Sequence, residues 1–168
     1  MTLQRLSLII LLAGLAVIGG AFYFQDVVGL TPCELCLKER VPWYAAIVGA
    51  GLWASLRHGN WIGPAVDRIF VIGFLLLFVV SISIAGYHVA VEHHWVAGPD
   101  ACAARKFAQM SLADLTKALL ETPPIRCDVV QWRFIGVSLA GWNAVLSAAM
   151  IALCGASLRW RRGTRKFG

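Results

Sequence analysis

Charged side chains are scarce in this chain of 168 residues. Asp, Glu, Lys and Arg together make up 14% of the residues, whereas hydrophobic residues make up 59%. An ordinary soluble domain has about 25% charged and about 45–50% apolar residues, so the composition excludes a typical water-soluble fold. Intrinsic disorder is excluded as well, because seven Trp and eight Phe, with abundant Leu, Val and Ile, would bury apolar surface.

Charge is absent from four long stretches that together contain 84 of the 168 residues. A helix crosses a bilayer core about 30 Å thick with about 20 apolar residues, within a range of about 17–25. Three stretches have this length, and the fourth, residues 41–56, reaches it only by including residues 37–40. Four such helices in so short a chain leave too little polar surface for a soluble bundle. We therefore predict one all-α domain, residues 1–168, forming an integral membrane four-helix transmembrane bundle with spans near residues 6–25, 37–56, 69–91 and 134–158.

The first apolar stretch also has the general composition of a secretory signal peptide. However, a single Arg precedes it, it is long for a signal peptide, and no clear small-x-small cleavage site stands before the next charge. We therefore interpret residues 6–25 as a retained span.

Basic residues are distributed unevenly between the segments that connect the spans. One set has eight basic residues in 27 positions and one acid, and it comprises residues 1–5, 57–68 and 159–168. The other set has seven basic residues in 57 positions and eight acids, and it comprises residues 26–40 and 92–133. By the positive-inside rule, the first set, with both termini, is cytoplasmic, and segments 26–36 and 92–133 face outward, which in a bacterial inner membrane is the periplasmic side. A basic tail can also bind nucleic acid, but beside a span it is more simply a topology anchor.

Five cysteines are present, and four of them lie outside the charge-free stretches. Cys33 and Cys36 fall in the first predicted periplasmic segment, and Cys102 and Cys127 fall in the second. Because the periplasmic face is oxidising, paired thiols there persist as disulfides. Cys154 lies within the last span, where a buried cysteine is usually an inert small hydrophobe.

Cys33 and Cys36 form a C-x-x-C motif directly after Pro32, at a predicted helix start. Unpaired backbone N–H groups there stabilise a thiolate, and Arg40, four residues after Cys36, shares its helix face. We therefore expect a lowered pKa for Cys36. The alternatives are half of a zinc site and a static disulfide. The spacing of the remaining His and Cys residues matches no compact zinc module, and so short a loop gains little stability. The motif therefore favours redox chemistry and no metal.

Cys102 and Cys127 lie 25 residues apart in the longer periplasmic segment. Leucines between them recur at helical spacing and predict a short amphipathic periplasmic helix from about Leu112 to Leu120, which lies on the membrane or packs onto the bundle end. By itself this pair indicates a structural staple for a long loop. Beside a C-x-x-C on the same membrane face, it favours a relay in which the two pairs exchange a disulfide by thiolate attack.

These residues resemble a known family, the DsbB family of bacterial disulfide bond formation proteins. The segment 32–40 is similar to the P-C-x-L-C-x-x-E-R motif of that family. The pair Glu92-His93, the two later cysteines and the run Gln131-Trp132-x-Phe134-x-Gly136 follow in the family's order. The resemblance covers nearly the whole chain. It implies a quinone-coupled thiol oxidase that regenerates a DsbA-like periplasmic oxidant with a thioredoxin fold.

The resemblance also implies a role for each periplasmic cysteine. Cys102 and Cys127 would be the disulfide that the reduced partner attacks, with Cys102 forming the mixed disulfide. Cys127 would pass electrons to Cys33. Cys36 would then be the thiolate that faces a ubiquinone or menaquinone ring.

Three further residues are implied as neighbours of the quinone. Arg40 would hold a quinone oxygen and stabilise the thiolate, while Glu39 and His93 would lie beside the ring. Another histidine, His88, stands inside the third predicted span, where it either faces a polar cavity or caps packing near the outer interface.

Two other functions are compatible with parts of the pattern. Vitamin K epoxide reductases also combine a four-helix bundle, a C-x-x-C and a quinone, but their motif belongs to the last span of the bundle. A membrane scaffold with two structural disulfides would need no quinone at all.

Overall fold

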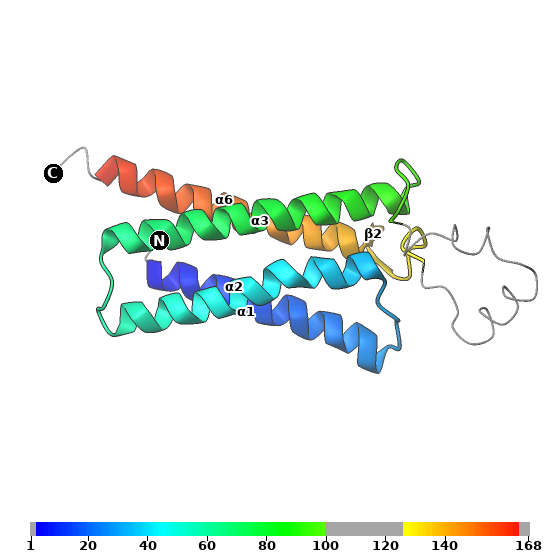
Figure 1. Cartoon of the computed structure of the whole chain (residues 1–168), viewed down its shortest axis with the longest axis horizontal. Helices are drawn as coiled ribbons and strands as arrows, with labels where there is room; N and C mark the ends of the chain where they lie inside the picture. Colours follow the sequence, from blue (N-terminus) through cyan, green and yellow to red (C-terminus); the bar gives the residue numbers. More distant parts are fainter. Residues whose placement is uncertain (1–2, 100–125, 165–168) are drawn as a thin grey trace, which may run out of the picture.

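The computed structural model describes residues 3–99 and 126–164, which form a bundle of four long helices (Figure 1). The elements in chain order are α1 (Leu3–Phe22), the π-helix η1 (Tyr23–Val27), α2 (Glu34–His58), α3 (Pro64–Glu92), the short strands β1 (Arg133–Phe134) and β2 (Val137–Ser138), and α6 (Leu139–Thr164). The helical bundle predicted from the charge-free stretches is thereby confirmed. The predicted amphipathic helix 112–120 lies outside the described residues.

The connections alternate between the two ends of the bundle (Figure 1). Helix α1 begins, the α2–α3 connection turns and α6 finishes at one end, whereas the α1–α2 connection and the β1–β2 hairpin lie at the other. Because α2 begins directly after Cys33, the C-x-x-C motif and the hairpin share this second end, which we call the cysteine end. Which side of a membrane the cysteine end faces stays a prediction.

Local sequence signals account for the starts of two helices. Cys33 is the N-cap of α2, with extended backbone angles, and its side chain accepts a hydrogen bond from the Cys36 N–H. Helix α3 has Pro64 in its first turn, where the missing N–H would have had no helical partner.

The last helix begins later than the apolar run suggests. The predicted span 134–158 starts within the hairpin, in which Phe134 pairs with Val137 across a two-residue turn. The turn residues Ile135 and Gly136 have φ angles of 53° and 78°, which match the primed turns of short hairpins. A left-handed turn cannot continue into a helix, so α6 starts only at Leu139.

Aromatic side chains fill the space between the helices. Trp43, Trp53 and Phe78 are each at most 1% exposed and belong to one apolar core. Helices α1 and α2 approach closely at Gly14, where an added Cβ would lie 2.7 Å from Ile47 Cγ1. A larger residue there would push the two helices apart.

Three helices in the described part of the chain are long and apolar enough to cross a membrane: Leu3–Val27, Pro64–Glu92 and Leu139–Arg159. Large apolar side chains face outward on the bundle, for example Leu12 at 63%, Val48 at 71% and Leu76 at 59% exposure. Lipid tails would cover such a surface without the cost that water imposes. Helix α2 carries charges in its first two turns, and its crossing of the bilayer stays a prediction.

Candidate functional site

The two cysteines of the C-x-x-C motif lie against each other at the start of α2. Their Sγ atoms are 2.9 Å apart, and the Cys36 backbone N–H donates to Cys33 Sγ at 3.3 Å. Both thiols are free; Cys33 is 2% exposed, and Cys36 is half-buried. The pair is therefore at a distance from which a small movement forms or breaks a disulfide bond.

The lower pKa belongs to Cys33, which corrects the expectation for Cys36. The hydrogen bond with the Cys36 thiol lowers the pKa of Cys33 to about 4, against the opposing effect of burial and with the help of the neighbouring His88. The same sulfur–sulfur hydrogen bond and burial raise the pKa of Cys36. Arg40 does not reverse this order, because its guanidinium donates to Gln25 Oε1 at 2.8 Å.

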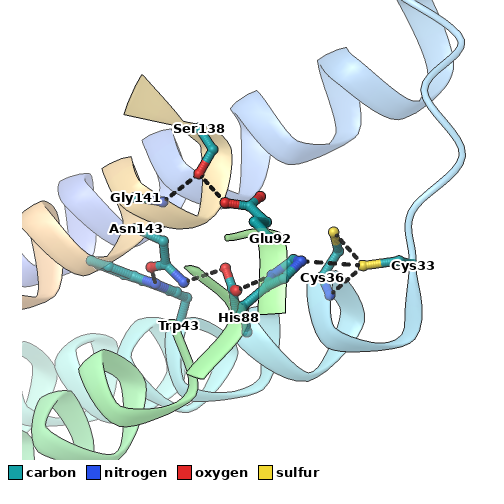
Figure 2. A network of polar contacts seen from close by, with 9 residues as sticks. Cys33, Cys36, Trp43, His88, Glu92, Ser138, Gly141 and Asn143 are labelled. Atoms are coloured by element: carbon teal, nitrogen blue, oxygen red, sulfur yellow. Dashed lines mark hydrogen bonds and ion pairs between the residues drawn. The ribbon is translucent and has the colours of Figure 1, made fainter. Parts of the chain in front are cut away.

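A chain of buried polar contacts runs from Cys33 into the bundle (Figure 2). His88 Nε2 of α3 lies 3.7 Å from Cys33 Sγ, and the other ring nitrogen, Nδ1, lies 2.6 Å from Glu39 Oε1. The second oxygen of Glu39 accepts from Asn143 Nδ2 at 2.8 Å, and Asn143 Oδ1 accepts from Trp43 Nε1 at 2.7 Å. Three helices, α2, α3 and α6, thus meet in one network that ends at a reactive sulfur.

A second polar contact fixes the hairpin to the end of α3. Ser138 Oγ donates to Glu92 Oε2 at 2.5 Å and accepts the Gly141 N–H at 3.1 Å (Figure 2). Ser138 therefore caps the first turn of α6 while it holds Glu92. Both Glu92 and the network of His88 face the same cavity.

The cavity at the cysteine end has a volume of about 470 Å³ and is bounded by η1, α1, α2, α3 and α6. Its wall is mostly apolar, with aromatic rings that include Phe24, Trp132 and Trp142. The polar residues on the wall comprise Gln25, Cys33, Cys36, Glu39, Arg40, His88, Glu92, Arg126, Gln131 and Asn143. A mostly apolar cavity with a few convergent polar groups is the usual form of a small-molecule site.

Of the three residues expected beside a quinone, two line this cavity. Arg40 lies over the Phe22 ring at 5.4 Å and donates to Gln25, so its guanidinium is held at the wall. Glu39 is also on the wall, but His88 and Asn143 occupy both of its oxygens.

The structure does not bring His93 to the cavity. It follows the last residue of α3, is exposed, and stacks on Trp95 with ring centroids 5.0 Å apart. His88 takes its place at the site, because it stands four residues before Glu92 on the same helix face. The position of His88 inside an otherwise charge-free span was a sequence signal for a functional role. The sequence around Asn143 gives no such signal.

Cys127 lies beside the C-x-x-C motif. It is disulfide-bonded, 1% exposed, and buried in a cluster with Cys33, Leu35 and Val91 against which Cys36 also packs. The predicted partner of the relay pair, Cys102, lies outside the described residues, so the pairing of Cys102 with Cys127 stays a prediction.

The segment that follows Cys127 contacts η1 and the connection that leads into α2. Gln131 Nε2 donates to the Thr31 carbonyl at 2.9 Å, and the Trp132 ring lies 4.6 Å from the Phe24 ring. These contacts keep Cys127 next to the C-x-x-C motif although nearly a hundred residues separate them.

The described residues of the site provide fewer ligands than a structural zinc site needs. One ligand atom each from Cys33, Cys36 and His88 lies within 4.8 Å of the others. A structural zinc site has four protein ligands, and the group found among residues 3–99 and 126–164 has three. Cys154 contributes nothing here, since it is free and fully buried in the main apolar core.

Comparison with known proteins agrees with this site. The family model for "Disulfide bond formation protein DsbB" matches residues 4–157. The chain is 31% identical to disulfide bond formation protein B 2 of Pseudomonas savastanoi pv. phaseolicola, over 91% of this chain and 88% of that protein. It is 30% identical to disulfide bond formation protein B of Albidiferax ferrireducens, over 97% and 91% of the two chains. A third relative, from Marinobacter nauticus, is 32% identical over 79% and 78%. With a family match over nearly its whole length and the C-x-x-C motif at the start of α2, the chain belongs to the DsbB family.

Proposed function

We propose that this disulfide-forming membrane thiol oxidase reoxidises a DsbA-like periplasmic dithiol protein and passes the electrons to a membrane quinone. The observation that carries the proposal is the burial of Cys127 in one cluster with Cys33, directly beside a cavity that Cys36 lines. This arrangement gives a disulfide-bonded cysteine access to the C-x-x-C motif and gives the motif access to a small molecule.

The relay consists of four thiol–disulfide exchanges. A thiolate of the reduced partner attacks Cys102 of a Cys102–Cys127 disulfide, so that a mixed disulfide forms and Cys127 leaves as a thiolate. Cys127 then attacks Cys33 of an oxidised C-x-x-C pair, and Cys36 leaves as the next thiolate. In the third exchange the partner's second thiolate attacks the mixed disulfide and frees Cys102, and in the fourth Cys102 attacks Cys127, which restores the Cys102–Cys127 disulfide and frees Cys33. Each exchange breaks one S–S bond and forms one, so both electrons reach the motif without any other oxidant.

The cavity fits the head group of a quinone. About 470 Å³ is within the usual range of small-molecule sites, and the apolar wall suits a lipid-soluble ring. Arg40, steadied by Gln25, would hold a quinone oxygen, and Cys36 would lie at the ring. A bound quinone supplies a sink that accepts two electrons and two protons. The protein's part is to hold the dithiol beside that sink and to keep water out.

The proposed location is the bacterial inner membrane, with the cysteine end periplasmic and both termini cytoplasmic. The charge bias of the connecting segments supports this orientation. The alternation of connections along the bundle agrees with both termini lying on one side, because the start of α1 and the end of α6 lie together at the end opposite the cysteine end (Figure 1).

The test is quinone reduction by the purified full-length protein, supplied with a reduced DsbA-like protein and a ubiquinone or menaquinone. Cys36→Ser removes the last thiol of the relay and should abolish steady-state turnover, whereas Cys154→Ser, the matched control in the apolar core, should retain it. Turnover that persists in Cys36→Ser would refute the assigned donor. An inactive parent protein whose disulfides both resist reduction would favour the structural scaffold.

A further inference from the structure

The direction of the hydrogen bonds from Trp43 to Cys33 follows from the chemistry of the groups. An indole N–H can only donate, so the group of Asn143 that faces Trp43 is its oxygen. The Asn143 amide nitrogen must then donate to Glu39, and the remaining Glu39 oxygen accepts the proton on His88 Nδ1. With Nδ1 protonated, the neutral imidazole presents the lone pair of Nε2, and this atom faces Cys33 Sγ at 3.7 Å.

Water has little access to this chain of contacts. His88 is 4% exposed, Glu39 7% and Asn143 8%. Among the described residues, Cys33 is the polar neighbour that the structure gives to Nε2. The ring is therefore fixed in orientation and in tautomer, which is the arrangement by which a carboxylate prepares a histidine to accept a proton.

We propose that His88, oriented by Glu39, is the base that takes the proton of the Cys33 thiol. His88 is then a catalytic residue, since it touches the reacting sulfur, and Glu39 and Asn143 are positioning residues. The inference rests on the proposed function for its place in turnover: the reduced partner brings two protons together with its two electrons, and the reduced C-x-x-C pair can hold one of these protons on Cys33. Thiol–disulfide chemistry proceeds through the thiolate, so this proton has to leave before the S–S bond forms again.

The balance of the step is simple. The Cys33 S–H bond breaks, its electron pair stays on sulfur, and the proton bonds to His88 Nε2, which gives a thiolate beside an imidazolium. Closing the Cys33–Cys36 disulfide then releases two electrons and, in total, two protons. A bound quinone would accept both electrons and both protons, and His88 regains its neutral form when it gives up its proton.

Other titratable and charged groups near Cys33 are engaged elsewhere. From α2, Arg40 is held by Gln25, and from α3, Glu92 accepts from Ser138. From the segment before β1, Arg126 is paired with Asp128. Helices α1 and α6 contribute no charged side chain to the described cavity wall. Cys127 packs in one cluster with Cys33, but it is disulfide-bonded and does not titrate. Within the described part of the chain, Cys36 is therefore the remaining titratable group at the Cys33 sulfur, and its proton is the second of the two.

A thiolate titration that needs neither quinone nor partner tests the proposal. The background is the full-length chain with Cys102→Ala, Cys127→Ala and Cys154→Ala, so that Cys33 and Cys36 are the remaining thiols. The reduced protein in detergent micelles, with a chelator present to remove adventitious zinc, is titrated by the ultraviolet absorbance of the thiolate. The two thiols titrate as a pair, and the lower macroscopic pKa is the quantity compared.

His88→Gln should raise that lower pKa by about one unit, which is about tenfold less thiolate at a given lower pH. Glu39→Gln, which keeps the shape of the side chain, should raise it by a smaller amount. His93→Gln is the matched control on the exposed end of α3 and should leave the titration unchanged.

Curves for His88→Gln and Glu39→Gln that both superimpose on the parent curve would overturn the proposal. If His88→Gln does not fold, Glu39→Gln decides by itself: a raised pKa supports the proposal, and an unchanged pKa overturns it. Failure of the proposed function is a separate result. If His88→Gln shifts the titration but the parent protein reduces no quinone, His88 remains the base for Cys33 and the proposed oxidase function is wrong.

Discussion

The two ends of the bundle each bury a carboxylate that an indole N–H helps to satisfy, but they do so with different partners. Near the end opposite the cysteines, Trp53 Nε1 donates to Asp67 Oδ1 at 2.9 Å, and Arg57 forms an ion pair with the same carboxylate. At the cysteine end, the indole of Trp43 acts on Glu39 only through Asn143. The partner of Glu39 is His88, whose second nitrogen faces a sulfur.

The difference separates a structural arrangement from a reactive one. Arg57 remains protonated at any ordinary pH, so the pair with Asp67 has one state and joins α2 to α3. A histidine between a carboxylate and a thiol can carry a proton or release it, and the cavity gives a substrate access to that thiol. A buried carboxylate thus does not indicate function by itself. The arrangement is reactive only where the partner of the carboxylate can bind and release a proton.

The largest expected difference between the two ends lies in the reactivity of their buried free cysteines. Since the pKa of Cys33 is lowered to about 4, its thiolate persists at neutral pH and is lost only as the pH falls through about 4. An unperturbed thiol, with a pKa of about 8.5, is less than about 1% thiolate at about pH 6. In the reduced protein we expect a small alkylating reagent at about pH 6 to modify Cys33 at least about a hundredfold faster than Cys154. Peptide mass spectrometry measures both rates in one sample, and equal rates would contradict the lowered pKa.

A mutation at the opposite end should change the free energy of unfolding and leave the pKa values of Cys33 and Cys36 unchanged. Arg57→Ala removes the cation of the ion pair with the buried Asp67, at a cost of about 2 kcal/mol in the free energy of unfolding. Arg68→Ala, which removes an exposed Arg one residue after Asp67, is the matched control and should cost much less. The measurement is reversible unfolding in detergent micelles, followed by the thiolate titration. A shifted titration in Arg57→Ala would show that the two ends are not independent.

The smallest expected effects come from the two indole donors. Trp43→Phe and Trp53→Phe each remove one N–H and keep most of the ring, so each should cost about 1 kcal/mol of unfolding free energy. Only Trp43→Phe should also raise the lower pKa of the cysteine pair, because only that indole acts on Glu39 through Asn143. Equal titration curves for both variants would remove Asn143 from the positioning of His88.

Much of the fold is predictable from where charge is missing. The apolar runs in α1, α3 and α6 have no other stable environment than lipid or a bundle core, and the C-x-x-C motif after Pro32 indicates the start of α2. The hairpin before α6 is not predictable in this way, because Phe134 and Ile135 extend the same apolar run. Its turn depends on backbone angles at Ile135 and Gly136 that hydrophobicity does not report.

The position of Cys33, Cys36 and Arg40 on one cavity wall was predictable, but the network behind them was not. Cys33, Cys36 and Arg40 stand close together in the sequence, so helical spacing alone places them on one wall. Asn143 lies a hundred residues from Trp43, and nothing local distinguishes it from an ordinary polar residue in a span. Such contacts depend on how α2, α3 and α6 pack, which is a property of the folded chain.

The placement of Cys33 as the N-cap of α2 has a consequence for the helix itself. The sulfur that exchanges bonds also accepts one of the free amides in the first turn of the helix, at 3.3 Å from the Cys36 nitrogen. A thiolate accepts such an amide strongly, whereas a sulfur committed to a covalent bond accepts it poorly, and an N-cap is worth about 0.5–2 kcal/mol. Each redox cycle therefore strengthens and weakens the hydrogen bond in the opening turn of α2. The stability of this turn, and its packing against neighbouring residues, thus depend on the oxidation state of the N-cap residue, Cys33.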